Sequence, residues 1–170
     1  MKNNYFSLKN KVFLVTGVTS GIGKGIAMFL LKNEAIVIGI GRDISKVKEI
    51  AKDTTEKFEF ISLDLTQIEK IEPALIKSIN EKGKLDGLVH CAGKEETIPL
   101  SIYKADKIRS IFEINVFSGI EILRIFSKKK YSNDNASAVF FSSVMGELGQ
   151  PGKVGYCATK SAILGVVKSA

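Results

Sequence analysis

The sequence has few of the residues that hold metal ions. It contains two cysteines, Cys91 and Cys157, and one histidine, His90. A structural zinc site needs four such ligands, and the two cysteines show no metal-ligand spacing, so we expect no bound metal. Two reduced and mostly buried thiols fit a cytosolic protein.

Long hydrophobic runs are also missing. The longest apolar stretches have the length of a β-strand, and the N-terminal segment MKNNYFSLKN lacks the apolar core of a signal peptide. No low-complexity tract is present, and 45% of the 170 residues are hydrophobic, which is enough for the core of one domain. We therefore expect a single cytoplasmic domain over residues 1–170, with no membrane partner.

The sequence carries an excess of positive charge that is spread along the chain. Its net charge is +7, from 25 Lys and Arg residues against 18 Asp and Glu residues. The tight basic cluster at residues 128–130 suits the last turn of a helix. Scattered basic residues argue against a nucleic-acid partner, and the positive field instead favours anionic ligands such as phosphates.

Short β-branched runs alternate with helical patterns. We predict strands at residues 11–16, 36–40, 58–63, 85–90 and 138–142. We predict a first helix with Ile22, Ile26, Phe29 and Leu30 on its apolar face, and further helices over residues 45–52, from a Thr66–Glu69 capping box to Gly83, around residues 108–123 and over residues 156–169. This alternation predicts an α/β fold, a doubly wound, mostly parallel sheet with helices on both faces. Such sheets bind ligands beyond the carboxyl ends of their strands.

A glycine-rich turn follows the first predicted strand, where residues 16–23 read TGVTSGIG. Gly17, Gly21 and Gly23 would permit a tight turn and a close approach of the backbone to a pyrophosphate, at the N-terminus of a helix. The spacing differs from the commoner G-x-G-x-x-G, and the residue after Lys24 is not Ser or Thr, which excludes a Walker loop. A turn without a ligand is the alternative, but the place after the first strand favours phosphate binding.

This turn resembles the T-G-x-x-x-G-x-G signature of the short-chain dehydrogenase/reductase family, and the resemblance extends from about Leu8 to the end of the chain. It implies a Rossmann-like fold that binds a dinucleotide through Gly17, Thr19, Ser20, Gly21, Ile22 and Gly23. Residues 90–93 (HCAG) resemble the family pattern N-N-A-G, which implies cofactor contacts from Cys91, Ala92 and Gly93, although Cys91 replaces an Asn. We interpret His90 as a buried histidine satisfied inside the sheet, not as a catalytic residue.

The end of the second predicted strand indicates which nucleotide binds. An acidic group there accepts hydrogen bonds from the ribose 2′-OH of NAD, whereas the 2′-phosphate of NADP needs a cation. By alignment with the family, Gly41 stands at the usually acidic position and Arg42 at the position that is often basic in NADP-preferring members. Asp43 is the competing residue, which we interpret as the cap of the next helix. We therefore expect NADP(H) to be preferred, with NAD(H) as the second possibility.

Asp64 and Leu65 follow the third predicted strand. In the family an aspartate at this place contacts the adenine ring, so the resemblance implies that both residues bind the cofactor. The alternative for Asp64 is a helix cap, because Thr66 follows directly.

Tyr156 and Lys160 lie four residues apart on the last predicted helix and therefore on one face of it. Such pairs are common, and a chance set of polar residues at strand and helix ends is the alternative. Asn115 and Ser143 complete the resemblance, since these four residues match the family's catalytic tetrad in order and spacing. The spacing to Tyr156 favours Ser143 over Ser142.

The chemistry of carbonyl reduction explains these residue types. Hydride transfer leaves an alkoxide that takes up a proton, and a phenol with a pKa of about 10 suits this task better when an ammonium group stabilises its phenolate. The resemblance implies that Tyr156 is the general acid or base, that Lys160 tunes it and holds the nicotinamide ribose, and that Tyr156 and Lys160 both contact the cofactor. It also implies that Ser143 binds the substrate oxygen and that Asn115 positions a water.

Family members normally continue past this last helix into further strands and a helix that cover the substrate. We therefore hypothesise that the 170 residues are a truncated piece of a longer enzyme, with an open edge at the fifth strand. The implied function is NADP(H)-dependent oxidation or reduction of a small-molecule carbonyl or secondary alcohol, by a homo-oligomer. A catalytically idle dinucleotide-binding or interaction fragment is the alternative. Residues 142–152 resemble the same loop in 3-oxoacyl-carrier-protein reductases, but this likeness does not identify the substrate.

Overall fold

Strands and helices alternate along the chain in a computed structural model that describes residues 7–47, 50 and 56–170. The elements are β1 (Val12–Thr16), α1 (Gly21–Lys32), β2 (Ile36–Gly41), η1 (Ile44–Val47), β3 (Phe58–Ser62), η2 (Ile68–Lys70), α3 (Ile71–Lys82), β4 (Leu85–His90), η3 (Leu100–Ile102), α4 (Ala105–Phe112), η4 (Glu113–Phe117), α5 (Ser118–Phe126), β5 (Ser132–Phe140), α6 (Met145–Leu148) and α7 (Val154–Ser169). The elements η1, η2 and η3 are short 3-10 helices, and η4 is a π-helical turn that joins α4 to α5.

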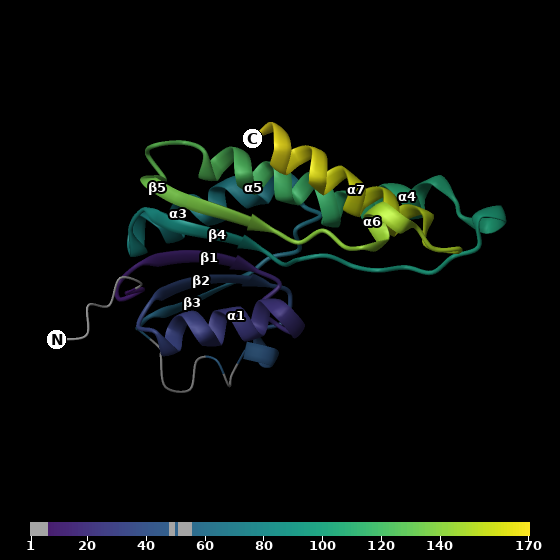
Figure 1. Ribbon diagram of the computed structural model, residues 1–170. Helices are drawn as coiled ribbons and strands as arrows, with labels where there is room; N and C mark the ends of the chain where they lie inside the picture. The colour runs from purple at the N-terminus through teal and green to yellow at the C-terminus, as the bar shows by residue number, and fades with distance from the viewer. Residues whose placement is uncertain (1–6, 48–49, 51–55) are drawn as a thin grey trace.

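The five strands form one parallel sheet in the order β3-β2-β1-β4-β5 (Figure 1). The direction of progression along the sheet reverses between β1 and β4, and the carboxyl ends of these two strands are neighbours, with Thr16 paired to His90. The predicted doubly wound parallel sheet is confirmed. The reversal between β1 and β4 creates the crevice at which such folds bind ligands.

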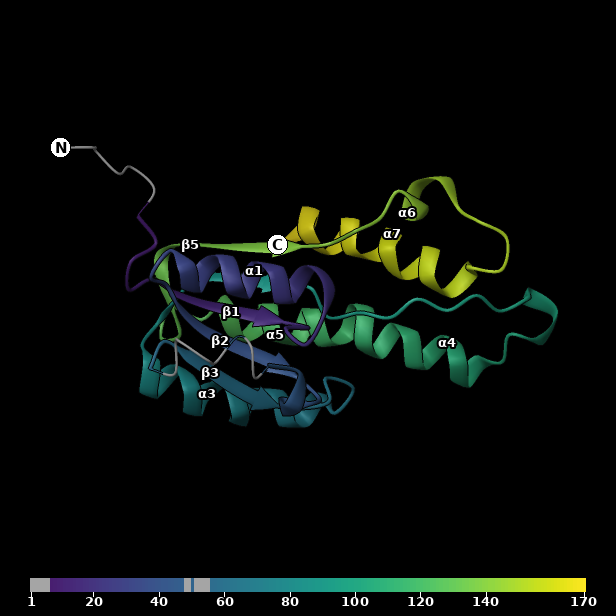
Figure 2. The same ribbon diagram turned by 90° about the horizontal axis from the view of Figure 1, so that it is seen from below.

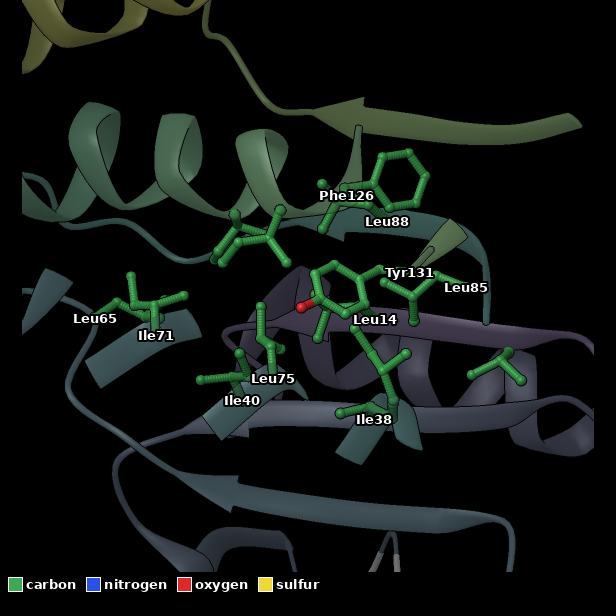
Figure 3. Packing of buried hydrophobic residues seen from close by; sticks show 14 residues of the cluster. Leu14, Ile38, Ile40, Leu65, Ile71, Leu75, Leu85, Leu88, Phe126 and Tyr131 are labelled. Atoms are coloured by element: carbon green, nitrogen blue, oxygen red, sulfur yellow. The ribbon is translucent and has the colours of Figure 1, made fainter. Parts of the chain in front are cut away.

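The hydrophobic core lies on both faces of the sheet. On one face, Leu14 and Leu88 of β1 and β4 are fully buried in a cluster with Leu75 of α3 (Figure 3). On the opposite face, Val15 of β1 is buried in a second cluster with Ala27 of α1. Each fully buried Leu or Val side chain stabilises the fold by roughly 1.5–3 kcal/mol. The two clusters hold the carboxyl ends of the strands in fixed positions.

The buried face of α1 differs from the predicted one. Ile22 and Phe29 are 60% and 61% exposed, whereas Gly23 and Ala27 are buried. The reason is a backbone contact, because a Cβ at Gly23 would lie 2.4 Å from the carbonyl oxygen of Gly17. The close approach of Gly23 to the turn sets the rotation of α1, so the predicted apolar face was wrong at Ile22 and Phe29.

Strand β5 begins at Ser132, well before the predicted start at residue 138. The added residues are mostly polar and exposed, and the pairing with β4 shifts register between Leu85 and Gly87. Among the described residues, no strand pairs with the outer edge of β5, and Val139 on this strand is 49% exposed. A strand at the edge of a sheet needs no alternating apolar pattern, which is why the sequence did not indicate its start.

Two helix starts also differ from the prediction. The Thr66–Glu69 capping box is wrong, because the Thr66 hydroxyl donates to the carboxylate of Asp64 and the short helix η2 precedes α3. Of the helix predicted over residues 45–52, the structure contains η1, and residues 48–49 and 51–52 lie outside the described residues.

Asp86 connects the N-terminal ends of three strands. Its carboxylate accepts hydrogen bonds from the Val12 N–H at 2.9 Å, Lys11 Nζ at 2.9 Å and Asn133 Nδ2 at 3.0 Å. Burial alone would raise the pKa of Asp86, but these hydrogen bonds outweigh it and hold the pKa below its ordinary value. Since the pKa is lower in the folded than in the unfolded state, this stabilisation is present at neutral pH and is lost as the pH falls through the folded-state pKa.

We expect Asp86→Asn to lower the free energy of unfolding by about 1–2 kcal/mol at neutral pH, because Val12 and Lys11 lose a charged acceptor. The deficit should shrink at about pH 3, because below the ordinary pKa of an aspartate the unfolded chain takes up the proton and the lowered pKa of the folded state stabilises it less. Urea unfolding at both pH values measures it. Glu34→Gln is the control, since the Glu34 side chain is 56% exposed and should contribute less than about 0.5 kcal/mol through its surface ion pairs. An equal deficit at both pH values would contradict the role of the charge.

Candidate active site

A groove of about 670 Å³ opens at the carboxyl ends of the strands, next to the reversal between β1 and β4. The helices α4 and α6 lie beyond these strand ends (Figures 1 and 2). The predicted cofactor contacts from the glycine turn and from the ends of β2, β3 and β4 all line this groove: Gly17, Thr19, Ser20, Gly21, Ile22, Gly23, Arg42, Asp64, Leu65, Cys91, Ala92 and Gly93. The structure therefore brings together residues from four separate parts of the sequence.

Several residues that line the groove were not predicted as cofactor contacts: Ile40, Gly41, Leu63, Thr66, Lys94, Ser110 and Ile114. Lys94 directly follows Gly93, so its position was a usable signal. Ser110 and Ile114 come from α4 and η4, and no local sequence pattern points to them.

The glycine turn brings backbone segments into direct contact. Gly17 and Gly21 have φ angles of 72° and 52°, in the left-handed region that favours glycine. A Cβ at Gly17 would lie 3.1 Å from the backbone nitrogen of Ala92, whereas a Cβ at Gly21 would meet no atom of the described residues within 4 Å. Gly17 is therefore required by packing, and the backbone at Gly21 is open to a ligand.

The N-terminus of α1 faces this open position. Helix α1 begins at Gly21, its first turn holds no acidic residue, and the Ser20 side chain makes no capping hydrogen bond to a described residue. The free N–H groups and positive dipole end of the helix are thus uncompensated, and an anionic group such as a pyrophosphate would complement them.

The end of β2 excludes an acidic side chain by its packing. A Cβ at Gly41 would lie 2.5 Å from the Thr19 methyl group and 3.1 Å from the Phe60 ring. Arg42 is exposed and lines the groove, and its carbonyl oxygen accepts a hydrogen bond from the Ser62 hydroxyl at 3.3 Å. Gly41 therefore stands at the position that the resemblance marks as usually acidic in NAD-preferring members, and the cation Arg42 follows it directly.

Asp43 and Asp64 both cap the turns that follow them. The Asp43 carboxylate accepts hydrogen bonds from the Ser45 hydroxyl at 2.6 Å and the Ser45 N–H at 2.9 Å, which lower its pKa and confirm its interpretation as a cap. The Asp64 carboxylate accepts hydrogen bonds from the Thr66 N–H at 3.0 Å and from the Thr66 hydroxyl at 2.9 Å. The bond from the N–H is the main cause of the lowered pKa of Asp64. Asp64 also lines the groove, so capping does not exclude a cofactor contact.

His90 and Cys91 are both uncharged at the end of β4. His90 is 3% exposed, and burial together with the charge of Lys160 lowers its pKa to about 4. Burial raises the pKa of Cys91 to about 11, so its thiol is protonated at neutral pH and is a weak nucleophile. The predicted burial of His90 is confirmed, but its Nε2 has no hydrogen-bond partner among the described residues.

Tyr156 and Lys160 lie on the same side of α7. Lys160 Nζ is 5.7 Å from the centroid of the Tyr156 ring and donates a hydrogen bond to the Phe141 carbonyl oxygen at 2.8 Å. Burial lowers the pKa of Lys160. The charge of Lys160 also lowers the pKa of the groove residue Cys91, but by less than burial raises it. The Phe141 carbonyl therefore holds the amine of Lys160 just after β5, near the Tyr156 ring, and neither Tyr156 nor Lys160 lines the groove.

The two serines after β5 have different partners. The Ser142 hydroxyl donates to the Lys160 carbonyl oxygen at 2.8 Å and so fixes α7 to the strand end. The Ser143 oxygen accepts the N–H of Met145 at 3.2 Å, an arrangement that leaves the hydroxyl proton of Ser143 available to a ligand.

Asn115 connects the groove wall to α7. It is 2% exposed, in the π-helical turn η4, and its side chain accepts the Lys94 N–H at 2.8 Å and donates to the Lys94 carbonyl oxygen at 2.9 Å. Its Nδ2 also donates to the Thr159 hydroxyl oxygen at 3.0 Å. Asn115 therefore fixes the position of α7, and with it Tyr156 and Lys160, relative to the segment after β4.

The described residues contain no group of three or more His, Cys, Asp or Glu side chains that could hold a metal ion. None of the described helices is both long enough and apolar enough to cross a membrane.

Comparison with known proteins identifies the family. The family model described as short chain dehydrogenase matches residues 11–170. The chain belongs to the short chain dehydrogenase family. This family consists of oxidoreductases that act on CH–OH and carbonyl groups.

Individual short chain dehydrogenases agree with this assignment. The 3-oxoacyl-[acyl-carrier-protein] reductase FabG of Haemophilus influenzae is 32% identical over 166 residues, which cover 95% of this chain and 67% of that protein. The 3-hydroxyacyl-CoA dehydrogenase type-2 of Drosophila melanogaster is 29% identical over 171 residues, with 94% and 67% covered. The chain spans about two thirds of the length of these relatives.

Solved structures of short chain dehydrogenases share the fold. A short-chain dehydrogenase from Streptomyces avermitilis superimposes with a TM-score of 0.86 at 30% identity, covering 94% of this chain and 58% of that one. A protein from Shigella flexneri, described as a short chain dehydrogenase complexed with NADP, superimposes with a TM-score of 0.85 at 28% identity, covering 94% and 70%. A solved protein with this fold, the one from Shigella flexneri, is thus described with NADP bound.

Proposed function

We propose that the protein is an NADP(H)-dependent oxidoreductase that interconverts a carbonyl group and a secondary alcohol of a small molecule, with Tyr156 as general acid or base. The observation that carries the proposal is the position of Lys160, whose amine lies 5.7 Å from the Tyr156 ring centroid and donates a hydrogen bond to the Phe141 carbonyl at the end of the fifth strand. A phenol, a nearby cation and a nicotinamide site together suffice for hydride transfer with proton transfer.

The bound dinucleotide supplies or accepts the hydride. During reduction, the Tyr156 hydroxyl donates a proton to the carbonyl oxygen, and the positive charge of Lys160 stabilises the resulting phenolate. The Phe141 carbonyl holds the Lys160 amine in place for this task. The Ser143 hydroxyl donates a hydrogen bond to the same substrate oxygen and keeps its proton.

Asn115 has a positioning role in this mechanism. Its side chain is engaged with the Lys94 backbone and with Thr159, so it keeps Tyr156 at a constant distance from the nicotinamide end of the groove. A water positioned near Asn115, through which Lys160 exchanges protons with solvent, is part of the proposal.

The preference for NADP(H) rests on the end of β2. A carboxylate that would bind the ribose 2′-OH does not fit at Gly41 without moving Thr19 or Phe60. The Arg42 guanidinium lines the groove directly afterwards and would pair with a 2′-phosphate.

We expect Arg42→Ala to weaken NADPH binding about tenfold and NADH binding less than about twofold, because NADH has no 2′-phosphate. Fluorescence titration of each reduced nucleotide measures the two dissociation constants. Lys46→Ala is the matched control, since Lys46 lies on η1 nearby but does not line the groove. Equal losses for both nucleotides would overturn the assignment of Arg42.

The substrate is proposed from the relatives. A 3-oxoacyl thioester is the first class to test, because relatives that share about 30% of their residues are named for 3-oxoacyl and 3-hydroxyacyl substrates. We place the protein in the cytoplasm as a single-domain homo-oligomer, on the basis of the family alone. Sedimentation velocity tests the oligomer.

A catalytically idle dinucleotide-binding fragment is the second candidate function, and the unpaired outer edge of β5 among the described residues favours it. NADPH titration combined with a panel of ketones and 3-oxoacyl thioesters separates the two. Binding with turnover supports the enzyme, binding without turnover supports the idle module, and absence of binding overturns both.

A further inference from the structure

A chain of hydrogen bonds leads from the buried His90 to the backbone of the groove wall. The backbone N–H of Ala92 donates to the Thr16 hydroxyl oxygen at 2.9 Å, and this oxygen lies 3.0 Å from Nδ1 of His90. Thr16 is fully buried and His90 is 3% exposed. The parallel register of β1 and β4, in which Thr16 is paired with His90, brings the two side chains together.

The direction of the Thr16–His90 hydrogen bond follows from the number of protons. The Thr16 hydroxyl already accepts the Ala92 N–H and has one proton to donate, and Nδ1 of His90 is its acceptor within the described part of the chain. If Nδ1 donated instead, both the Thr16 proton and Nε2 would be buried without a partner. The arrangement with an unprotonated Nδ1 leaves one buried group unsatisfied instead of two.

Nε2 of His90 lies in closely packed, partly aromatic surroundings. A Cβ at Gly119 would lie 3.1 Å from Nε2 and 3.0 Å from the Phe140 ring, so this side of the imidazole is closely packed. The ring centroids of His90 and Phe140 are 5.3 Å apart, at an interplanar angle of 41°.

The hydrogen-bond chain ends at the groove. Ala92 lies between Cys91 and Gly93 in the wall that faces the glycine turn, and all three residues line the groove. The backbone nitrogen of Ala92 is also the atom nearest to a Cβ built onto Gly17, at 3.1 Å. A shift of Ala92 would therefore change the width of the groove where the turn and the wall meet.

We propose that His90, as the neutral imidazole protonated on Nε2, is a positioning residue of the cofactor site that acts through Thr16 and Ala92. The inference rests on the proposed function only in that the groove binds a dinucleotide. His90 is 3% exposed and does not line the groove, so we assign it a positioning role and not a catalytic one. Its low pKa keeps the imidazole neutral at pH 7, as a hydrogen-bond acceptor at Nδ1 must be.

The tautomer is tested by nitrogen NMR of the imidazole. His90 is the only histidine of the 170 residues, so the imidazole resonances of ¹⁵N-labelled protein can be attributed to His90 without further assignment to a residue. At neutral pH we expect Nε2 to show the shift of a protonated nitrogen and Nδ1 that of an unprotonated one. The opposite tautomer, or a mixture of both, overturns the inference whether or not the protein binds NADPH.

The positioning role is tested with two variants of Thr16. Thr16→Val has the same shape but neither donates nor accepts, and we expect the dissociation constant for NADPH to rise about tenfold. Thr16→Ser keeps the hydroxyl and should stay within about threefold of the wild type. Unchanged binding in Thr16→Val, or equal losses in both variants, overturns the role.

Ser78→Ala controls for a general loss of stability. The hydroxyl of Ser78, a buried residue of α3, donates a hydrogen bond to the carboxylate of Glu59 on β3 at 2.5 Å. Neither residue lines the groove. It should lower the melting temperature without changing the NADPH dissociation constant. If Ser78→Ala weakens NADPH binding as much as Thr16→Val does, the effect of Thr16 is general destabilisation and the inference fails. Failure of the wild-type protein to bind NADPH or NADH is a different result, which overturns the proposed function.

Discussion

Tyr156→Phe is expected to lower turnover by about a thousandfold while the dissociation constant for NADPH stays within about twofold of the wild-type value. The substitution removes the proton that the alkoxide needs, yet it keeps the ring beside Lys160 and leaves the groove intact, because Tyr156 does not line it. Single-turnover oxidation of NADPH with a reactive ketone measures the chemical step, and fluorescence titration measures binding.

Tyr131→Phe is the matched control for this experiment. Tyr131 is 6% exposed in the core, at the end of the sheet where β5 begins, and the change of atoms is the same. It should leave both turnover and NADPH binding unchanged. If Tyr156→Phe keeps more than about a tenth of wild-type turnover, a group other than Tyr156 transfers the proton.

The order of the elements could be predicted because strands and helices here have distinct local patterns. The limits of β4 agree with the predicted 85–90, since this central strand is bounded by Gly83 and by the residues of the groove. The start of β5 and the buried face of α1 could not be predicted, because they depend on the sheet edge and on the contact between Gly23 and Gly17. In both cases tertiary packing overrides the local apolar pattern.

The candidate site was predictable where it follows a strand directly. Parallel strands end at the same edge of the sheet, so residues placed just after them meet in one groove, as those of the glycine turn, Arg42 and Asp64 do. Ser110 and Ile114 reach this groove from α4 and η4, and no sequence pattern gives the docking of those helices.

The side-chain hydrogen bonds of the site could not be read from the sequence. Asn115 was predicted for its order in the tetrad, but its contacts with Lys94 and Thr159 depend on the π-helical turn and on the docking of α7. The contact between Thr16 and His90 spans 74 positions and depends on the register of two strands. A pattern of residue types predicts which chemistry is available, whereas register and docking decide which groups touch.

Gly23→Ala and Gly25→Ala should have opposite effects, although the two glycines lie two positions apart on α1. A Cβ at Gly23 would lie 2.4 Å from the carbonyl oxygen and 2.8 Å from the carbonyl carbon of Gly17, and backbone atoms cannot move aside as a side chain can. We expect a loss of about 2–3 kcal/mol in the free energy of unfolding, as for other overpacked sites. The displaced glycine turn should also weaken NADPH binding at least about a hundredfold.

Gly25 supplies the control on the same helix. It is exposed, and a Cβ there would meet no atom of the described residues within 4 Å, so Ala should raise the free energy of unfolding by about 0.5–1 kcal/mol through its higher helix propensity. NADPH binding should not change. Urea unfolding and NADPH titration of both variants measure the difference. A Gly23→Ala protein that binds NADPH as tightly as Gly25→Ala would show that the close contact between α1 and the glycine turn does not shape the cofactor groove.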